Sequence, residues 1–458
     1  MKHQLLLTLG LLMTSLSFGQ TYFSKQEVQE ELNTLKETLI DAHYNAFAYT
    51  TPEAFEAGYQ DLYSKITQDS LSLLETTNLL QQLPALLKNG HTLIDFPAPS
   101  YIAYAQEGGT VFPLELAFET DTVYVRKNWS TEAEIEPGAQ LLRINGQPMT
   151  EIVSRIRPQI AAERPYFSNA FLEGFSFPRY YWQVFGAQEN YSVTLQEDGQ
   201  PKTYTLAAIP AIEAYEMRRN EVINSTQKLQ FYEQAAYLSP GAFSGALEEY
   251  KSFIDSAFTA INTRKSANLI IDLRNNPGGD DAFSDYLVGY LARQPFQWNS
   301  SFRLKTSEAL KAHIRAKQDT TAAFWKRALT RPNGTQYAYN FEPTSPQPEH
   351  LRYTGKVYAL INRQSYSQAA VTAAQLQDYK LATLVGEETA DYPSLYASVF
   401  RYTLPITGIE VQIAKGYIVR VNGSERAEGV LPDLFIRDHL LDEEDEILNQ
   451  LLKHLSKS

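Results

Sequence analysis

Residues 269–279 read LIIDLRNNPGG, and this stretch decides the kind of fold that we expect. A largely apolar segment, long enough for a short strand, runs into a polar turn that ends in Pro277, Gly278 and Gly279. Glycine permits backbone conformations with positive φ, so a turn of this kind exposes backbone N–H groups. At the carboxyl end of a parallel strand it lies where α/β proteins place their ligands. A Pro-Gly-Gly turn is common by itself, but the complete string is much rarer.

The surrounding residues 230–436 alternate between apolar strands and amphipathic helices. We expect strands at 268–273, 356–361 and 383–385, and helices at 246–263, 281–292 and 368–379. This alternation predicts an α/β fold, in which helices cover a mainly parallel sheet. Residues 294–352 are polar and weakly patterned, and we interpret them as a helical or loop-like insertion. We therefore assign residues 211–458 to an α/β domain.

Residues 106–210 change to a pattern of short strands. Residues 135–147 combine a Pro-Gly turn, a short apolar strand and an Asn-Gly turn that favours a tight hairpin. This stretch resembles the "Gly-Asp-x-Leu-x-x-Ile-Asn-Gly" segment of PDZ-like modules, with Ala139 in place of the aspartate. The resemblance implies a PDZ-like, β-rich module that binds extended peptide ends by adding a strand to a sheet edge. A small β domain without a ligand is the alternative.

The first part of the chain predicts two further units. Residues 1–19 combine a basic start, an apolar run too short to span a bilayer and small residues before position 20. That layout is typical of a secretory signal peptide, so we expect export to the periplasm or the outside of the cell. Residues 20–105 have leucines at helical spacing. We interpret them as a helical cap that includes a strand at 91–96.

The composition excludes several classes of protein. The 458 residues include no cysteine, which excludes disulfides and a thiol nucleophile. The 7 histidines are scattered and no phosphate loop or zinc motif is present, so we expect neither a metal site nor a cofactor. A formal net charge of −13 argues against nucleic acid as a partner. No segment after the first 19 residues is apolar enough for a membrane span.

The string at 269–279 closely resembles the "Leu-Asp-Leu-Arg-Asn-Asn-Pro-Gly-Gly" motif of the C-terminal-processing (tail-specific) serine peptidases. The order of helical cap, PDZ-like module and α/β domain is also similar to that of this family, so the resemblance covers almost the whole chain. It implies that residues 211–458 form the catalytic domain. It also implies that Gly278 or Gly279 supplies a backbone amide to an oxyanion hole.

Residues 362–370 read NRQSYSQAA and lie between an expected strand and an expected helix. A serine at this junction has an exposed hydroxyl, and the amide of Gln368 is then placed to help bind an oxyanion. Helix capping is the alternative explanation, because serine is an ordinary N-cap residue. The stretch resembles the "Ser-Ala-Ser-Glu" segment of the same family, with Ala370 in place of the glutamate. The resemblance implies that Ser367 is the nucleophile.

The family's bacterial branch uses a lysine as the base, about six residues beyond the glycine that Gly386 matches, but this sequence has Tyr392 at that position. Residues 88–92 read KNGHT and resemble the "Asp-Gly-His-Thr" motif of the tricorn-like branch, in which the histidine is the base. The resemblance implies that His91 takes this role, although Asn89 replaces the aspartate. A neutral imidazole with a pKa near its usual value of about 6.5 suits proton abstraction from serine. A structural histidine is the alternative.

The tricorn-like branch also uses a late glutamate to orient the polar groups of the site. Residues 424–433 read SERAEGVLPD and resemble the family's closing motif, shortened by two residues. The resemblance implies that Glu428 or Glu425 takes this role, depending on where the gap falls. Either residue also suits a solvated loop.

The sequence therefore predicts a secreted serine-type peptidase that hydrolyses peptide bonds through an acyl-enzyme on Ser367. Its expected partner is a polypeptide or peptide substrate. A catalytically inactive, exported peptide-binding protein with the same fold is the alternative, because Asn89, Ala370 and Tyr392 depart from the family pattern. An enzyme that uses the same groups on another acyl substrate is a third interpretation.

Overall fold

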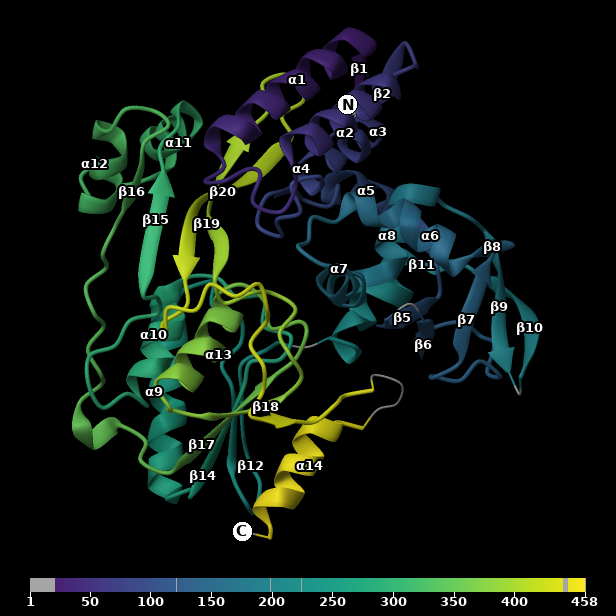
Figure 1. The fold of residues 1–458 in the computed structure, drawn as a ribbon. Coiled ribbons are helices and arrows are strands. Elements are labelled where there is room, and N and C mark those ends of the chain that lie inside the picture. Colours follow the sequence, from purple (N-terminus) through teal and green to yellow (C-terminus); the bar gives the residue numbers. More distant parts are fainter. Residues whose placement is uncertain (1–20, 121, 198, 224, 440–443, 458) are drawn as a thin grey trace, which may run out of the picture.

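The computed structural model describes residues 21–457 except 121, 198, 224 and 440–443 (Figure 1). The expected signal peptide lies outside the described residues. Within them, no helix combines the length and the apolar character that crossing a membrane requires.

The α/β domain is built on a sheet of six strands in the order β12-β13-β14-β17-β18-β21. These strands are β12 (Lys228–Phe231), β13 (Ala236–Ser239), β14 (Asn268–Asp272), β17 (Lys356–Ile361), β18 (Thr383–Gly386) and β21 (Leu434–Phe435). All neighbouring pairs from β13 to β21 are parallel, and only β12 is antiparallel to its neighbour. The expected α/β domain with a mainly parallel sheet is therefore confirmed.

Both faces of this sheet are covered by helices, which explains why residues 269–271 are apolar without alternation. Leu269 and Ile271 face the core beneath α9 (Leu247–Arg264), α10 (Asp281–Gly289) and α13 (Gln368–Asp378). Ile270 points to the opposite face, where it packs with residues of α14 (Glu446–Leu455). Adjacent side chains of a strand point to opposite faces, so each face receives its own apolar cover.

A second sheet stands beside the parallel one and has the strand order β16-β15-β20-β19, with β3 paired to β20. Its strands are β3 (Leu93–Ile94), β15 (Ser301–Lys305), β16 (Gln336–Ala338), β19 (Leu395–Thr403) and β20 (Glu410–Val419). Residues 294–352 supply β15 and β16 as well as α11 (Glu308–Lys317), α12 (Ala323–Thr330) and η5 (Glu349–Leu351). The expected insertion thus also contains strands, because alternate residues of β15 are buried against the core.

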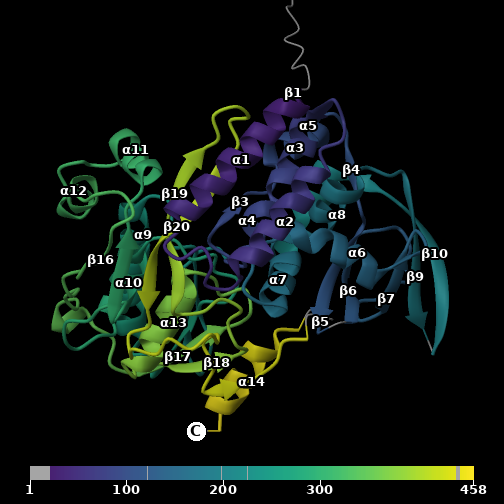
Figure 2. The same cartoon turned by 45° about the horizontal axis from the view of Figure 1, so that its top comes forward.

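The first helices pack on this second sheet, as Figures 1 and 2 show. They are α1 (Lys25–Ala42), α2 (Pro52–Ser64), α3 (Leu73–Leu80) and α4 (Gln82–Ala85), with β1 (Tyr22–Ser24) and β2 (Ser70–Ser72) forming a small ladder. Ser24 and Glu27 form a capping box at the start of α1, and this fixes the start of the helix. The strand expected at 91–96 is only two residues long, and its pairing with β20 carries residues 89–92 toward the α/β domain.

The β-rich module contains a sheet in the order β10-β9-β7-β6-β5, with β8 paired to β7. Its elements are β5 (Leu114–Glu119), β6 (Thr122–Asn128), β7 (Gln140–Ile144), β8 (Gln147–Pro148), α6 (Met149–Ile156), β9 (Asn190–Glu197) and β10 (Gln200–Ala207). Flanking elements are α5 (Ala98–Gln106), β4 (Thr110–Val111), η1 (Arg157–Gln159), β11 (Ile209–Pro210), η3 (Ala211–Tyr215) and η4 (Glu216–Glu221). The strands expected around 111–125 and 140–144 are present.

Three helical segments inside this module were not expected. They are α7 (Pro165–Phe171), η2 (Leu172–Ser176) and α8 (Phe177–Phe185). Figures 1 and 2 both show α7 between the β-rich module and the α/β domain. This helical segment of the module therefore lies on the side that faces the α/β domain.

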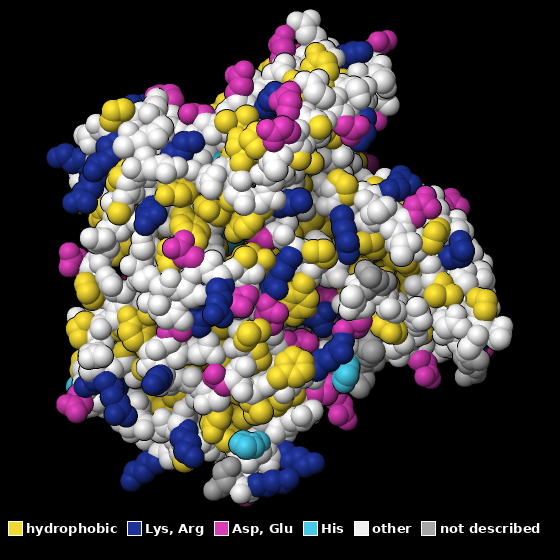
Figure 3. All heavy atoms as spheres, in the orientation of Figure 1, with side chains coloured by type: hydrophobic (Ala, Val, Ile, Leu, Met, Phe, Trp, Pro, Cys, Tyr) yellow, Lys and Arg dark blue, Asp and Glu magenta, His cyan; other side chains and the backbone are white. Residues whose placement is uncertain are grey.

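Acidic and basic side chains are interspersed over the face of the molecule drawn in Figure 3. The net charge of −13 is thus not gathered into one acidic patch on this face.

Candidate active site

Ser367 lies at the junction where β17 has ended and α13 begins, and its backbone is strained. Its φ of 54° and ψ of −123° form a combination that residues other than glycine rarely adopt. Its side chain makes no capping hydrogen bond to the helix, so capping does not account for this serine. Strain of this kind points to a functional constraint on the position of the hydroxyl.

Ser365, two residues earlier, has a different environment. Its hydroxyl is fully buried, donates to the carbonyl oxygen of Leu273 at 2.8 Å and accepts from the amide of Asn362 at 3.1 Å. The bond to Leu273 ties this loop to the end of the neighbouring strand β14, and the bond from Asn362 closes the loop itself. Ser365 therefore stabilises the loop, and its hydroxyl is already engaged.

The glycine turn expected from the sequence lies directly against Ser367. A Cβ atom on Gly278 would stand 2.6 Å from the carbonyl oxygen of Tyr366 and 2.8 Å from the Cβ of Ser367. Gly278 also has a φ of 79°. Only glycine allows the turn after β14 and the loop of Ser367 to approach so closely at this point.

The amides around Ser367 differ in availability. The N–H of Gly278 donates to the side-chain oxygen of Asn276 at 2.9 Å. Gly279 forms a parallel β-bridge with Phe243. The hydrogen bonds of this bridge join Phe243 to Gly278 and Asp280, so the N–H of Gly279 points away from Phe243. The N–H of Gln368 belongs to the first turn of α13 and has no acceptor within the helix. Gly279 and Gln368 are thus the better placed of the three candidate amides to bind an oxyanion.

His91 reaches this region from the loop before β3. Its ring stacks on Tyr366, and the Tyr366 hydroxyl donates to the carbonyl oxygen of Gly90 at 2.9 Å. Neither ring nitrogen of His91 forms a hydrogen bond with any residue that the structure describes. Burial lowers the pKa of His91 to about 3, so the imidazole is neutral at physiological pH.

Asp391, which the sequence analysis did not single out, lies beside both residues. Its Oδ2 accepts a hydrogen bond from the amide of Ser367 at 2.7 Å and stands 3.8 Å from Nε2 of His91. Its Oδ1 accepts from the amide of Tyr392 at 2.8 Å. The side chain is completely buried, and burial raises the pKa of its carboxyl well above the usual value.

Glu163 is a second buried carboxyl of the site. Its Oε1 accepts from the side chain of Asn89 and from the amide of Gly90, both at 3.0 Å. Its Oε2 has no hydrogen-bond partner among the described residues, and burial raises the pKa of Glu163 to about 7. Asn89 also lies 3.3 Å from Nε2 of His43, so the amide in the place of the family's aspartate joins His43 to Glu163.

Arg164 fixes the segment that carries Glu163. It forms an ion pair with Glu388 at 2.7 Å and donates to the carbonyl oxygens of Thr389 and Ala390. These contacts hold the segment before α7 against the loop that contains Asp391.

Glu425 and Glu428 lie apart from these groups. Glu425 accepts a hydrogen bond from the hydroxyl of Tyr417 at 3.1 Å, and Glu428 lies 3.6 Å from Arg426. Neither glutamate makes a hydrogen bond or an ion pair with His91 or Ser367 in the described structure. Their role in orienting the site stays a prediction.

An apolar cavity of about 280 Å³ opens next to Ser367. Pro277 of the glycine turn and Tyr366 form one side of it. Asn275, Arg363 and Gln364 also line it, and the other side consists of residues from α7, η2 and the segment after η4: Phe167, Ala170, Phe171, Gly174, Phe175, Ile223 and Ser225. A cavity of this size and character suits an apolar side chain.

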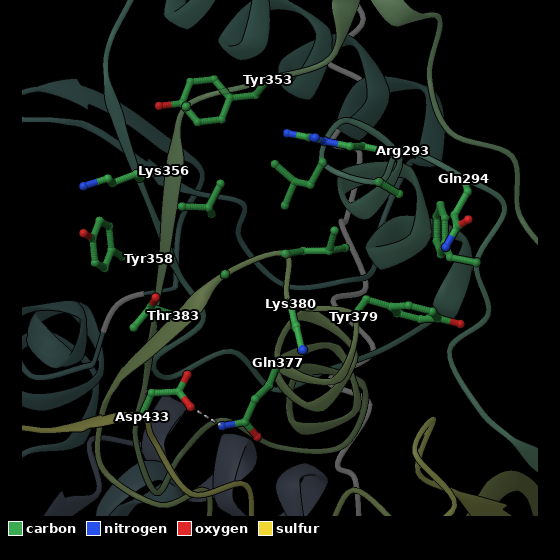
Figure 4. Close-up of a pocket in the computed structure, with 17 residues that line it drawn as sticks. Arg293, Gln294, Tyr353, Lys356, Tyr358, Gln377, Tyr379, Lys380, Thr383 and Asp433 are labelled. Atoms are coloured by element: carbon green, nitrogen blue, oxygen red, sulfur yellow. Dashed lines mark hydrogen bonds between the residues drawn. The ribbon is translucent and has the colours of Figure 1, made fainter.

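A wider cavity of about 860 Å³ lies at the other end of the parallel sheet (Figure 4). Lys356 and Thr383, which line it, are the first residues of β17 and β18, whereas Ser367 follows the last residues of β17. This cavity is therefore not part of the candidate site. The described residues also contain no cluster of three or more His, Asp or Glu side chains suited to a metal ion.

The fold and the site together define a class of protein: an α/β protein with a strained serine between a parallel strand and a helix, facing a glycine turn. Residues 234–436 match the model of Peptidase family S41. This match and the structural neighbours support the fold of the C-terminal-processing peptidases.

Structures of CPAF are among the similar solved structures. The structure of mature CPAF is 15% identical, with a TM-score of 0.64, and the match covers 94% of this chain and 96% of that chain. The structure of mature CPAF complexed with lactacystin is 14% identical, with a TM-score of 0.61, and the match covers 94% and 97% of the two chains. At this level of identity the likeness concerns the fold alone. A comparison with curated proteins finds no match.

Proposed function

We propose that this chain is an exported serine peptidase that cleaves peptide bonds through an acyl-enzyme on Ser367. The observation that carries the proposal is the strained backbone of Ser367, whose side chain caps no helix and which lies so close to Gly278 that a Cβ on that glycine would clash with it. The hydroxyl attacks the peptide carbonyl, and His91 takes its proton and returns it to the leaving amine. Water then hydrolyses the ester. Secretion rests on residues 1–19 alone.

The amides of Gly279 and Gln368 are the proposed oxyanion donors. Both come from elements that the fold holds rigidly: the turn after β14 and the first turn of α13. The side chain of Gln368 donates to the hydroxyl of Ser284 at 2.9 Å, which anchors the start of α13 to α10. Donors fixed in this way need no reorganisation when negative charge develops on the substrate oxygen.

Two features support a peptide as the substrate. The apolar cavity beside Pro277 and Tyr366 suits the side chain of a residue next to the scissile bond. A groove of about 460 Å³ also runs between β5, β6 and α6, with Phe118, Val123, Met149 and Val153 in its lining. β5 is an edge strand, and strand addition at such an edge is how PDZ-like modules bind peptides.

Labelling with a fluorophosphonate, followed by peptide mapping, tests the nucleophile. We expect the label on Ser367, no labelling after Ser367→Ala, and labelling of Ser365→Ala in proportion to its folded fraction. Lactacystin, the compound in one of the CPAF structures, serves as a competitor for the label. A label on another residue, or none on a folded protein, contradicts the proposal.

The second candidate function is an inactive peptide-binding protein. The observation that favours it is the absence of a hydrogen bond between either ring nitrogen of His91 and any described residue. Catalytic hydrogen bonds are often long without substrate, so this observation alone does not exclude catalysis. A folded protein that binds apolar peptides but neither reacts with the fluorophosphonate nor cleaves them identifies this second function.

A further inference from the structure

We infer that Asp391 is the positioning carboxyl of the site: it fixes the backbone of Ser367 and balances the charge of His91 when His91 takes the serine proton. The inference rests on the proposed peptidase function, and it names a residue that the sequence analysis did not assign.

Asp391 lies next to both Ser367 and His91. Its Oδ2 accepts the backbone N–H of Ser367 and also faces Nε2 of His91, so a single carboxyl oxygen lies close to both residues. The distance of 3.8 Å to His91 is longer than a hydrogen bond, so the imidazole needs only a small shift to donate to this oxygen.

A positive charge on His91 needs a negative charge nearby. His91 is almost completely buried, and an imidazolium formed there without a partner would be strongly disfavoured. In the proposed step the Oγ–H bond of Ser367 breaks, a bond forms between Oγ and the substrate carbonyl carbon, and the proton moves to His91. A carboxylate at Asp391 then faces the new cation and lowers the free energy of that state.

Charged and polar groups around Asp391 influence whether its carboxyl is ionised. The groups that face it are His91 from the loop before β3, Glu163 and Arg164 from the segment before α7, Tyr366, and the adjacent Tyr392. Glu163 raises and Arg164 lowers the pKa of Asp391, so two buried carboxyls share one nearby cation. The deprotonation of this pair, rather than that of His91, then sets the rise of activity with pH.

The role of Asp391 differs from that of a carboxylate that only accepts two backbone amides. A purely structural Asp391 would affect folding, and its removal would leave the pH profile of the folded protein unchanged. A positioning Asp391 affects the rate and the pH profile at constant folded fraction.

The test compares Asp391→Asn, Glu163→Gln and the matched control Asp285→Asn across pH 5 to 9. Asp285 is likewise buried with a raised pKa. It belongs to α10, and its carboxyl accepts hydrogen bonds from the side chains of Thr344 and Gln375. The readouts are the rate of Ser367 labelling by a fluorophosphonate and kcat/KM on an apolar peptide, each corrected for the folded fraction.

We expect Asp391→Asn to lower both rates about 100-fold and to remove the rise with pH. We expect Glu163→Gln to move the rise to lower pH by about one unit, because it removes a like charge. Asp285→Asn should leave the pH profile of the folded protein unchanged.

The outcomes separate the two proposals. Wild-type rates and an unchanged profile in folded Asp391→Asn overturn this inference alone, while Ser367 remains the nucleophile. If Asp391→Asn does not fold, the profile of Glu163→Gln decides, and an unshifted rise overturns the inference. Absence of labelling at Ser367 in the wild-type protein overturns the proposed function, and this inference with it.

Discussion

The imidazole of His91 lies nearly parallel to the phenol ring of Tyr366, with ring centroids 4.8 Å apart and an angle of 14° between the planes. Tyr366 directly precedes Ser367, so this stacking attaches the histidine to the loop of the serine. The hydrogen bond from the Tyr366 hydroxyl to Gly90 adds a second attachment on the histidine side. The two segments are far apart in the chain, and Tyr366 holds them together.

The first prediction concerns these two contacts of Tyr366. Tyr366→Phe keeps the ring and removes one hydrogen bond, so it should lower the free energy of unfolding by about 1 kcal/mol and preserve labelling of Ser367. Tyr366→Leu removes the ring that orients His91 and should slow labelling about 10-fold or more, since it disturbs proton transfer. Equal labelling rates in the two folded variants, measured with a fluorophosphonate, would show that stacking does not position His91.

The second prediction concerns the pH dependence of stability at Glu163. Its pKa is about 7 in the folded protein and 4.5 as the ordinary value, so the unfolded state releases the proton first as pH rises. Glu163 therefore lowers the free energy of unfolding progressively between about pH 4.5 and pH 7, by up to about 3 kcal/mol. Glu163→Gln should be close to wild type in stability at pH 5 and more stable at pH 7.5.

Urea unfolding at these two pH values measures the effect of Glu163. Glu387→Gln is a parallel test, because burial also raises the pKa of Glu387 to about 7, so by the same reasoning this variant should gain stability relative to wild type as the pH rises from 5 to 7.5. A Glu163→Gln variant that is less stable than wild type at both pH values would show that Glu163 is ionised in the folded state.

The third prediction concerns Gly174, which lines the apolar cavity beside Ser367. A Cβ atom there would lie 3.3 Å from Cγ of Gln364 and 3.9 Å from Cδ1 of Ile223, so a larger side chain projects into the cavity. Gly174→Val should lower kcat/KM about 10-fold for peptides with a large apolar residue at the scissile bond, and less for alanine. Gly289→Val is the control, since Gly289 lies on α10 away from this cavity. If the ratio of kcat/KM between the two peptides does not change, the cavity does not take part in substrate recognition.

The sequence was sufficient to predict the parallel sheet, because strands buried on both faces read as continuous apolar runs such as residues 269–271. It was also sufficient to identify Ser367 and the glycine turn as candidate site residues, since both lie just after strands. The hairpin of β19 and β20 was missed, although residues 395–403 and 410–419 are rich in β-branched and aromatic residues. The helical segment from α7 to α8 was missed because Gly174 and Pro178 interrupt it.

Asp391 and Glu163 could not be identified from local sequence, because their roles arise from contacts between distant segments. One signal for Asp391 was available: it directly precedes Tyr392, the position at which the bacterial branch has its lysine. Glu163 gave no signal, since an acidic residue next to Arg164 suits any solvated loop. Only the packing of this segment against residues 89–91 buries Glu163.

The last prediction compares two glycines with nearly the same backbone conformation. Gly278 has a φ of 79° and Gly146 a φ of 78°, so alanine at either position carries the same conformational cost of about 1 kcal/mol. A Cβ on Gly146 meets nothing within 4 Å, whereas on Gly278 it meets the backbone nitrogen of Gln368 at 2.7 Å and Cβ of Ser367 at 2.8 Å. Gly278→Ala should therefore displace Ser367 and the oxyanion amides and slow labelling about 100-fold, since oxyanion donors act only at short range. Gly146→Ala should lose a similar part of its stability to strain and keep the wild-type labelling rate. Thermal unfolding and fluorophosphonate labelling of both variants separate the two effects, and normal labelling in folded Gly278→Ala would exclude the glycine turn from the site.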